Sequence, residues 1–169
     1  MDYLNIPLVA LLLLILGDFV ATFVYHVPEH VFGRYHSLVH HSANRSFVLY
    51  SIRARRPQAL IPGFLGAFPY LVLIPLLWPL SASGTMLGLL LAEGHVIWRH
   101  RFETGYRTPV GLQRLCQYLC ITTPERHQLH HRNANLAFGD IFTFYGQPAA
   151  LWLQWLRQFK QRLSQMTWG

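Results

Sequence analysis

The chain is 169 residues long, the usual size of one domain, and we treat 1–169 as a single unit. Hydrophobic residues make up 52% of it and charged residues only 12%, against about 25% charged residues in soluble proteins. This composition argues against an ordinary soluble fold and predicts an all-α integral membrane protein. The net charge of +7 comes without a nucleic-acid-binding motif, so we expect no nucleic-acid partner.

The first predicted element is a membrane span over Ile6–Tyr25. This run of about twenty residues matches one crossing of a bilayer, and Asp18 is its only charge. It has no basic leading region and no small-residue cleavage site, so we predict a retained helix and not a signal peptide.

The second predicted element is a helical hairpin in the uncharged stretch 59–91, which is too long for one comfortable span. Small residues and glycine at 81–84 permit a tight reversal, which predicts helices near 59–80 and 84–98. The first of these helices should be kinked by its four prolines, which are Pro62, Pro69, Pro75 and Pro79. A re-entrant hairpin that does not cross the membrane fully is the alternative.

One span followed by a hairpin gives about three membrane helices and places 26–58 and 98–169 on one side of the membrane. All fourteen lysines and arginines lie at Arg34 or later, and none falls in 1–5 or 81–84. By the positive-inside rule this side is cytoplasmic. We therefore predict a cytoplasmic cap of helices that contains the histidines, with its basic residues near anionic lipid headgroups.

The segment after Gly146 has the pattern of an amphipathic helix. Its apolar residues recur at helical spacing: Trp152, Trp155, Leu156, Phe159 and Leu163. Two placements stay open at this point. The helix lies either in the membrane interface or against the protein's own cap.

All ten histidines fall in short clusters, and spacings of three or four in three of these clusters are typical of one helical face, whereas His95 and His100 form a looser pair five residues apart. The clusters are His26/His30, His36/His40/His41, His95/His100 and His127/His130/His131. Imidazole is a common ligand of Fe, Cu, Zn and Ni through a neutral ring nitrogen. A mononuclear zinc site is complete with about four ligands, so ten candidates predict two metal ions.

Two chemistries fit such a centre, and spacing alone does not separate them. Iron would activate oxygen, whereas zinc would support hydrolysis through a bound water of lowered pKa. The sequence has no nucleophile elbow, Walker loop or dinucleotide-binding fingerprint, so an oxidoreductase would receive its reducing equivalents from a partner. Cys116 and Cys120 lie outside the clusters, and we expect them to be buried thiols.

Three of the few carboxylates lie next to histidine clusters and are candidates for orienting the ligand rings. They are Glu29, Glu93 and Glu125. Helix capping or a surface charge is the alternative for each. Glu93 ranks first, because a carboxylate at the end of an apolar helix is costly to keep.

The motifs resemble those of the fatty acid hydroxylase and sterol desaturase superfamily, membrane enzymes with a histidine-ligated di-iron centre. The closest stretch is Thr123–Phe142, TPERHQLHHRNANLAFGDIF, which is similar to the terminal HxxHH box of that family. On this match His127, His130 and His131 carry over as metal ligands. Asn135, Gly139 and Asp140 carry over as structural supports.

The order of the boxes is also similar to that of bacterial beta-carotene hydroxylases, with His95 and His100 in the penultimate box. The first box, HxxxH at His26 and His30, is nearer the sterol and fatty acid form. The second box reads HSLVHH, where the family usually has HxxHH. On a regular helix the extra residue prevents His36 and His41 from both keeping the family's relative angle.

The resemblance implies an O2-dependent di-iron oxidoreductase that hydroxylates a lipid chain: fatty acyl, sterol-like or carotenoid. It further implies two iron ions as cofactor, with all ten histidines as candidate ligands. An external electron donor, a ferredoxin or small cytochrome with its reductase, would supply electrons. The alternatives are a lipid desaturase with the same centre, a membrane metal-binding protein without redox turnover, and a degenerate member serving as a scaffold.

Overall fold

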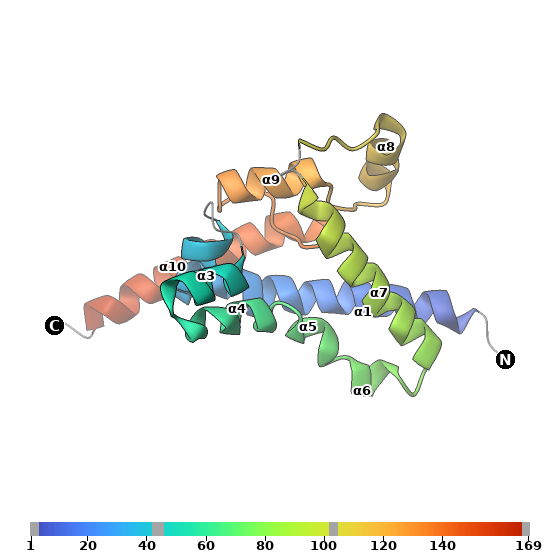
Figure 1. The fold of residues 1–169 in the computed structure, drawn as a ribbon, viewed down its shortest axis with the longest axis horizontal. Coiled ribbons are helices and arrows are strands. Elements are labelled where there is room, and N and C mark those ends of the chain that lie inside the picture. The colour runs from blue at the N-terminus through green and yellow to red at the C-terminus, as the bar shows by residue number, and fades with distance from the viewer. Residues whose placement is uncertain (1–3, 42–45, 102–104, 167–169) are drawn as a thin grey trace.

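The computed structural model describes residues 4–41, 46–101 and 105–166, and the regular elements within these ranges are helical (Figure 1). In the same ranges one isolated antiparallel bridge joins Ile121 to Phe142, and no strand forms. The predicted all-α class is therefore confirmed for the described part of the chain.

The first helix is longer than the predicted span. α1 (Asn5–Val20), η1 (Ala21–His26) and α2 (Val27–Phe32) follow one another without a break and give 28 helical residues, about 42 Å in length. η1 is a π-helix, a rare widening that occurs frequently at functional sites. Because the helix continues beyond the apolar run, His26 and His30 stand on the same helix as the predicted span.

The proline-rich stretch is divided into short helices. After α3 (Phe47–Ala54) come η3 (Pro57–Ala59), α4 (Leu60–Leu65), α5 (Phe68–Leu71) and α6 (Ile74–Leu77). Pro69 and Pro75 each stand in the first turn of a new helix, where the missing N–H would have no helical partner. The segments Pro57–Leu65 and Phe68–Leu77 are bent by 46° relative to each other, which confirms the predicted kink.

The second helix of the predicted hairpin is confirmed as α7 (Ala82–Arg99). The chain reverses earlier than predicted, because residues 78–80 form the turn. Ser81 is the N-cap of α7, and its Oγ accepts a hydrogen bond from the Gly84 N–H at 3.0 Å. The prediction of a turn at 81–84 was wrong, because a serine that caps a helix belongs to its start and not to the preceding turn.

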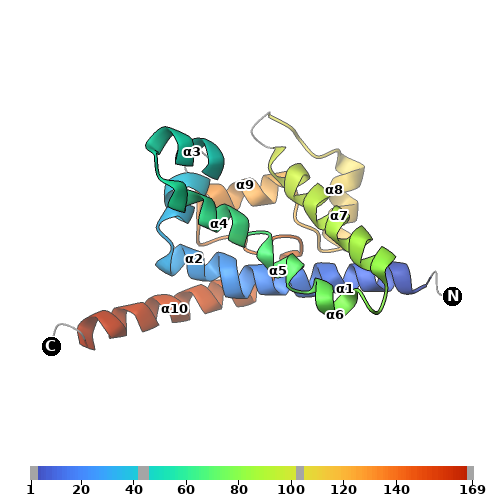
Figure 2. The same ribbon diagram turned by 60° about the horizontal axis from the view of Figure 1, so that its bottom comes forward.

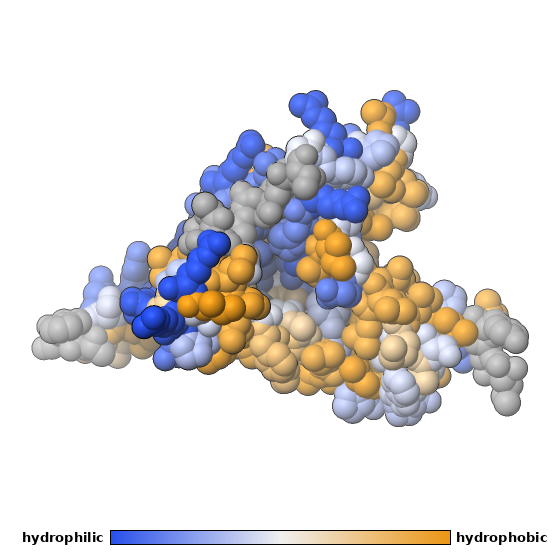
Figure 3. Space-filling view, in the orientation of Figure 1, coloured by the Kyte–Doolittle hydropathy of each residue, from blue (hydrophilic) through white to orange (hydrophobic). Residues whose placement is uncertain are grey.

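One helix is long and apolar enough to cross a membrane by length and composition, Asn5–Phe32. The bent pair Pro57–Leu65 and Phe68–Leu77 reaches that standard only when its halves are taken together, as a broken span or a re-entrant loop. α7 carries polar and charged residues in its second half. The described residues thus contain one or two candidate spans where about three were predicted. Exposed apolar side chains follow α4–α6, in keeping with membrane contact (Figure 3).

α7 packs closely along α1 because small residues line its contact face. A Cβ on Gly84 would lie 2.7 Å from the carbonyl oxygen of Ile6, and a Cβ on Gly88 would lie 3.1 Å from that of Ala10. Ala92 continues this row one turn later. Small residues four apart permit the close approach of membrane helices. This row was not recognised from sequence.

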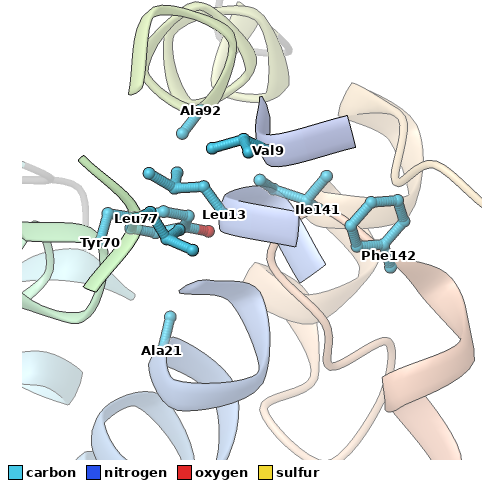
Figure 4. Packing of buried hydrophobic residues seen from close by; sticks show 8 residues of the cluster. All are labelled: Val9, Leu13, Ala21, Tyr70, Leu77, Ala92, Ile141 and Phe142. Carbon is cyan, nitrogen blue, oxygen red and sulfur yellow. The ribbon is translucent and has the colours of Figure 1, made fainter. Parts of the chain in front are cut away.

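The hydrophobic core surrounds α1, and side chains from distant parts of the chain converge on it (Figure 4). Its buried members are Val9, Leu13, Ala21, Tyr70, Leu77, Ala92, Ile141 and Phe142. The Tyr70 ring fills the space where Gly17 has no side chain, since a Cβ there would lie 2.3 Å from the ring. α5, α6, α7 and the loop after α9 are thereby held around one helix.

A Gly84→Ala variant tests the packing of α7 on α1. The added Cβ would meet a backbone oxygen, so we expect a loss of about 1–3 kcal/mol from overpacking, larger than the gain in helix propensity of about 1 kcal/mol. Thermal unfolding in detergent measures the difference. Gly94→Ala is the matched control, because a Cβ there meets nothing within 4 Å. Equal midpoints for the two variants would contradict the close packing.

The remaining helices are α8 (Val110–Tyr118), α9 (Pro124–Arg132), η5 (Thr143–Tyr145) and α10 (Gly146–Met166). α10 is the predicted amphipathic helix, and it runs beside α2 (Figure 2). Its buried side chains pack with those of α2 and with Phe138; they are Ala149, Leu153 and Leu156. A second apolar stripe that includes Trp155 and Phe159 is exposed. Packing against the cap is therefore confirmed for one face of the helix, and contact of the other face with the membrane interface stays a prediction.

Candidate metal centre

Eight of the ten histidines form two groups, and within each group the candidate ligand atoms all lie within 4.8 Å of one another. The first group consists of His26, His30, His41 and His130, and the second of His40, His100, His127 and His131. They come from the first helix, from η2 (His36–His40) and the residue after it, from the end of α7, and from α9. Helices far apart in sequence thus bring members of all four clusters together.

In the first group the Nε2 atoms converge. His130 Nε2 lies 2.9 Å from His26 Nε2 and 3.1 Å from His30 Nε2. His41 Nε2 is buried and has no hydrogen-bond partner within the described ranges. Nitrogens that bind one ion at about 2.1 Å lie roughly 3 Å from one another, so these separations fit a metal site.

The second group has the same arrangement. His127 Nε2 lies 3.1 Å from His100 Nε2 and 3.1 Å from His131 Nε2. The His40 ring completes the group, with its centroid 4.5 Å from that of His131. All eight candidate ligand atoms are imidazole nitrogens, the type of donor that suits Fe, Cu, Zn and Ni.

Adjacent histidines in the sequence belong to different groups. His40 and His131 belong to the second group, whereas their neighbours His41 and His130 belong to the first. Consecutive side chains on a helix point about 100° apart, so an HH pair faces two neighbouring sites at once. The two groups therefore lie side by side, with the His41 and His131 ring centroids 5.0 Å apart.

The extra residue in the second box is accommodated by a π-helix. η2 covers His36–His40, and the His41 N–H donates to the His36 carbonyl at 3.3 Å, five residues back. This wider turn keeps the His36 and His41 rings together, with centroids 5.1 Å apart. The predicted conflict between them assumed a regular helix, and the helix here is not regular.

His36 lies between the two groups, in contact with rings of both. Its ring centroid is 4.7 Å from that of His30 and 5.1 Å from that of His40. The side chain is buried, and neither ring nitrogen has a hydrogen-bond partner among the described residues. His36 therefore offers a further nitrogen donor.

His95 is, after His36, the second predicted ligand that belongs to neither group. Its Nε2 donates to the Thr122 carbonyl at 2.9 Å and so ties α7 to the segment before α9. The five-residue spacing from His100 had made this pair the loosest of the clusters. Of the His95/His100 pair, only His100 belongs to the second group.

Hydrogen bonds to Nδ1 orient several ligand rings. His26 Nδ1 donates to Asp140 Oδ1 at 3.1 Å, His130 Nδ1 to the Leu136 carbonyl at 2.8 Å, and His100 Nδ1 to the Val96 carbonyl at 2.7 Å. Acceptors at Nδ1 leave the Nε2 lone pair for a metal. Asp140 was predicted only as a structural support, and its position shows that it also selects the tautomer of His26.

Asp140 is held in turn by Arg99 of α7. The Arg99 guanidinium donates to the Asp140 carbonyl at 2.8 Å and lies 3.0 Å from its Oδ1. Burial favours the neutral acid, but this guanidinium and His26 hold the pKa of the Asp140 carboxyl well below its usual value. The Asp140 carboxylate is therefore charged at neutral pH and can accept the hydrogen bond from His26 Nδ1.

Asp18, the lone charge in the first apolar run, fixes the loop that carries Asp140. Its carboxylate accepts the backbone N–H groups of Asp140, Ile141 and Phe142 at 2.9, 3.0 and 2.6 Å. The Thr22 hydroxyl donates to the same carboxylate at 3.0 Å. A buried charge is tolerated only when it is paired or hydrogen-bonded in this way. Sequence reasoning noted Asp18 but missed this role.

None of the three glutamates forms a hydrogen bond or ion pair with a histidine among the described residues. Glu125 accepts from the Thr108 N–H at 2.6 Å and from the Thr108 hydroxyl at 2.9 Å, so its predicted role in orienting a ring is wrong. These two bonds lower the pKa of the Glu125 carboxyl, although burial opposes them. Glu29 Oε2 is buried without a hydrogen-bond partner in the described ranges. Glu93 lines the cavity described below.

The other two residues carried over as supports hold the loop after α9. Asn135 Oδ1 accepts from the Arg157 guanidinium at 2.7 Å, which joins this loop to α10. Gly139 has a φ of +99°, and a Cβ there would lie 2.2 Å from the Phe142 carbonyl. Only glycine fits at this position, directly before Asp140.

Burial keeps the imidazoles of His36, His40, His127 and His130 neutral. It lowers the pKa of His130 and of His36 from 6.5 to about 2, and neighbouring histidines reinforce the shift. Burial also lowers the pKa of His40 and His127 well below 6.5. Neutral rings are the form that binds metals.

The metal-free protein should lose stability as the pH falls below 6.5. These folded-state pKa values are depressed, so the unfolded chain binds more protons between pH 6.5 and about 2, and the free energy of unfolding falls as the pH falls through this range. Unfolding of chelator-treated protein between pH 7.5 and 5 measures the slope. His130→Gln should reduce the slope of the free energy of unfolding against pH by the contribution of about one bound proton. An unchanged slope in this variant would contradict the neutral buried ring.

A cavity of about 480 Å³ adjoins the histidines. Its polar lining includes His26, His36, His40, Arg99 and Asp140. Its walls are mainly apolar and come from α4, α5 and α7; among them are Pro62, Ala67, Leu71, Leu89 and Val96. The face in Figure 3 is hollowed between these helices. The volume is in the range of sites for small organic ligands.

Comparison with known proteins agrees with this geometry. The fatty acid hydroxylase family model matches residues 10–147, which include all ten histidines. No curated protein and no solved structure gives a significant match to the chain. The match covers most of the chain, so the protein belongs to the fatty acid hydroxylase family.

Proposed function

We propose that this protein is an O2-dependent di-iron membrane oxidoreductase that hydroxylates a lipid chain. Membership of the family supports an oxidoreductase of lipid hydroxylase type. The observation that carries the finer proposal is the pair of four-histidine groups beside a mainly apolar cavity, which His26 of the first group and His40 of the second group line. An alkyl chain in this cavity would lie next to metal ions held by the two groups.

The donor set fits two iron ions. The first group and the second group would each hold one ion, with His36 as an additional donor between them. Bound iron would supply the oxidant that takes hydrogen from a C–H bond. Neither group contains a thiolate, so all the candidate metal donors in the two groups are imidazole nitrogens.

The remaining residues prepare the site. Asp140 and the carbonyls of Leu136 and Val96 hold ligand rings with Nε2 directed at the groups. The apolar walls exclude water and align an extended chain. The sequence has no dinucleotide-binding fingerprint, so a ferredoxin or small cytochrome with its reductase would deliver electrons at the cap, which we place on the cytoplasmic face.

Product analysis under labelled oxygen tests this proposal. Iron-loaded protein in bilayers, with an electron donor system and a mixture of candidate lipids, should yield a product heavier by one ¹⁸O atom. A product lighter by two hydrogens would identify a desaturase. Stable binding of two irons with no lipid turnover for any substrate class would favour a metal-binding protein, and no bound metal would favour a scaffold.

A further inference from the structure

A second cleft, of about 830 Å³, lies between α9 and the chain around the start of α8. Residues 105–110 and Gln113 form one wall, and Glu125, Gln128 and Arg132 of α9 form the other. Among the described residues, this cleft shares no lining residue with the apolar cavity. A molecule seated in the cleft can therefore leave the apolar cavity open to a lipid.

α9 separates this cleft from the second histidine group. Glu125, Gln128 and Arg132 are three and four residues apart, so they share one face of the helix. His127 and His131 of the second group lie on a different face, and each directly precedes a residue that lines the cleft. A helix with its side chains is about 10–12 Å wide, so the cleft lies roughly one helix width from this group.

The charge around the cleft is positive. Arg107 and Arg132 line it, one on each wall, and both are exposed. Glu125 is the one carboxylate among the lining residues, and both of its oxygens accept hydrogen bonds from the opposite wall. Residues 105–132 include four arginines, one glutamate and no lysine or aspartate, which gives a net charge of +3 with the histidines neutral. The cleft thus favours a negatively charged partner.

The proposed reaction needs a partner that delivers electrons and leaves again. Insertion of one atom of O2 into a C–H bond forms an alcohol and water, and it consumes two electrons and two protons. A carrier that holds one electron must therefore dock twice for each product, while the protons come from the solvent. Electron-transfer complexes have small interfaces, and complementary charges speed their formation.

We propose that this cleft is the docking site of the electron donor, and that the donor is a small one-electron carrier with an acidic face, of the ferredoxin class. The inference rests on the proposed function and adds to it where the donor binds and which charge its surface carries. Electrons would cross α9 to the second group, while the lipid occupies the separate cavity that His26 and His40 line.

Binding of a ferredoxin tests this inference without lipid turnover. Full-length zinc-loaded protein in phosphatidylcholine nanodiscs is titrated with an acidic plant-type ferredoxin by isothermal titration calorimetry at several salt concentrations. A basic cytochrome c is the second probe. The wild type should bind the ferredoxin with an affinity that falls as salt is added, and it should not bind the cytochrome. Absence of ferredoxin binding to the wild type would overturn the inference.

Two double variants separate the cleft from the overall charge of the protein. Arg107→Glu/Arg132→Glu should weaken ferredoxin binding at least about tenfold at low salt, because two attractive charges become repulsive. Arg53→Glu/Arg162→Glu is the matched control, with the same change in net charge at exposed positions of α3 and α10, on the side of the molecule away from α8 (Figure 1). It should bind ferredoxin as the wild type does. Both variants should keep the metal content and melting temperature, because all four side chains are exposed.

Two results with these variants would overturn the inference. An equal loss of ferredoxin affinity in both would show attraction by the overall charge alone. The second result concerns dihexanoyl phosphatidylglycerol, a soluble anionic lipid. If it raised the melting temperature of the wild type but not of Arg107→Glu/Arg132→Glu, and ferredoxin affinity were the same in both, the cleft would be a site for a lipid headgroup.

The docking site and the proposed function can fail separately. Ferredoxin binding that depends on Arg107 and Arg132, in a protein that oxidises no lipid, would keep the docking site and remove the hydroxylase proposal. Lipid oxidation at limiting ferredoxin that is equally fast in the wild type and in Arg107→Glu/Arg132→Glu would keep the hydroxylase and remove the docking site.

Discussion

His130→Ala is expected to abolish product formation and to remove one of the two metal sites while leaving the other. His130 Nε2 is the centre of the first group, within about 3 Å of the Nε2 atoms of His26 and His30. Its neighbour His131 belongs to the second group, so His131→Ala should remove the other site. Loss of metal-orienting contacts alone costs 10–100-fold in affinity or activity, and loss of a ligand should cost at least about 100-fold.

Metal analysis by mass spectrometry of each purified variant measures this effect. Each single variant should retain about one ion per chain, and His130→Ala/His131→Ala should retain none. His95→Ala is the matched control, because His95 bonds to the Thr122 carbonyl and lies in neither group. It should keep both ions. Wild-type metal content and product yield in His130→Ala would refute the two-group assignment.

Asp18→Ala is expected to have the largest effect on stability. It leaves the buried N–H groups of Asp140, Ile141 and Phe142 without their acceptor. Each unsatisfied buried donor costs about 1–3 kcal/mol, so the total reaches several kcal/mol. Because Asp140 orients His26, the same variant should also bind metal more weakly at the first site.

Thermal unfolding and metal titration in detergent measure both consequences. Thr22→Val is the control, because it removes only the hydroxyl that donates to Asp18 and should cost about 1 kcal/mol. If Asp18→Ala unfolds entirely, Asp18→Asn keeps an acceptor oxygen and should fold with intermediate stability. Similar melting temperatures for Asp18→Ala and Thr22→Val would contradict the stabilising role of the three hydrogen bonds that Asp18 accepts from the loop.

Local patterns determined much of the fold. The apolar run at Ile6–Tyr25 and the row of prolines after residue 59 predicted a long helix and a broken one, and both are observed. Helical repeats depend only on neighbours along the chain, so they can be read without knowing the fold. Capping is equally local, yet Ser81 was placed in a turn, because a serine suits both positions.

The ten clustered histidines and the box at Thr123–Phe142 also predicted a metal centre and the family; the family is confirmed, and the structure contains two groups of histidines that could hold metal ions. Only the tertiary structure decided how the histidines divide. His40 and His41 are neighbours in sequence but belong to different groups, and His95 lies outside both. Spacing specifies which rings share a helical face, whereas the partners of each ring depend on how separate helices meet. The same reason explains why Asp140, and not Glu125, orients a ligand ring: hydrogen bonds across 114 residues, such as that from His26 to Asp140, follow from packing alone.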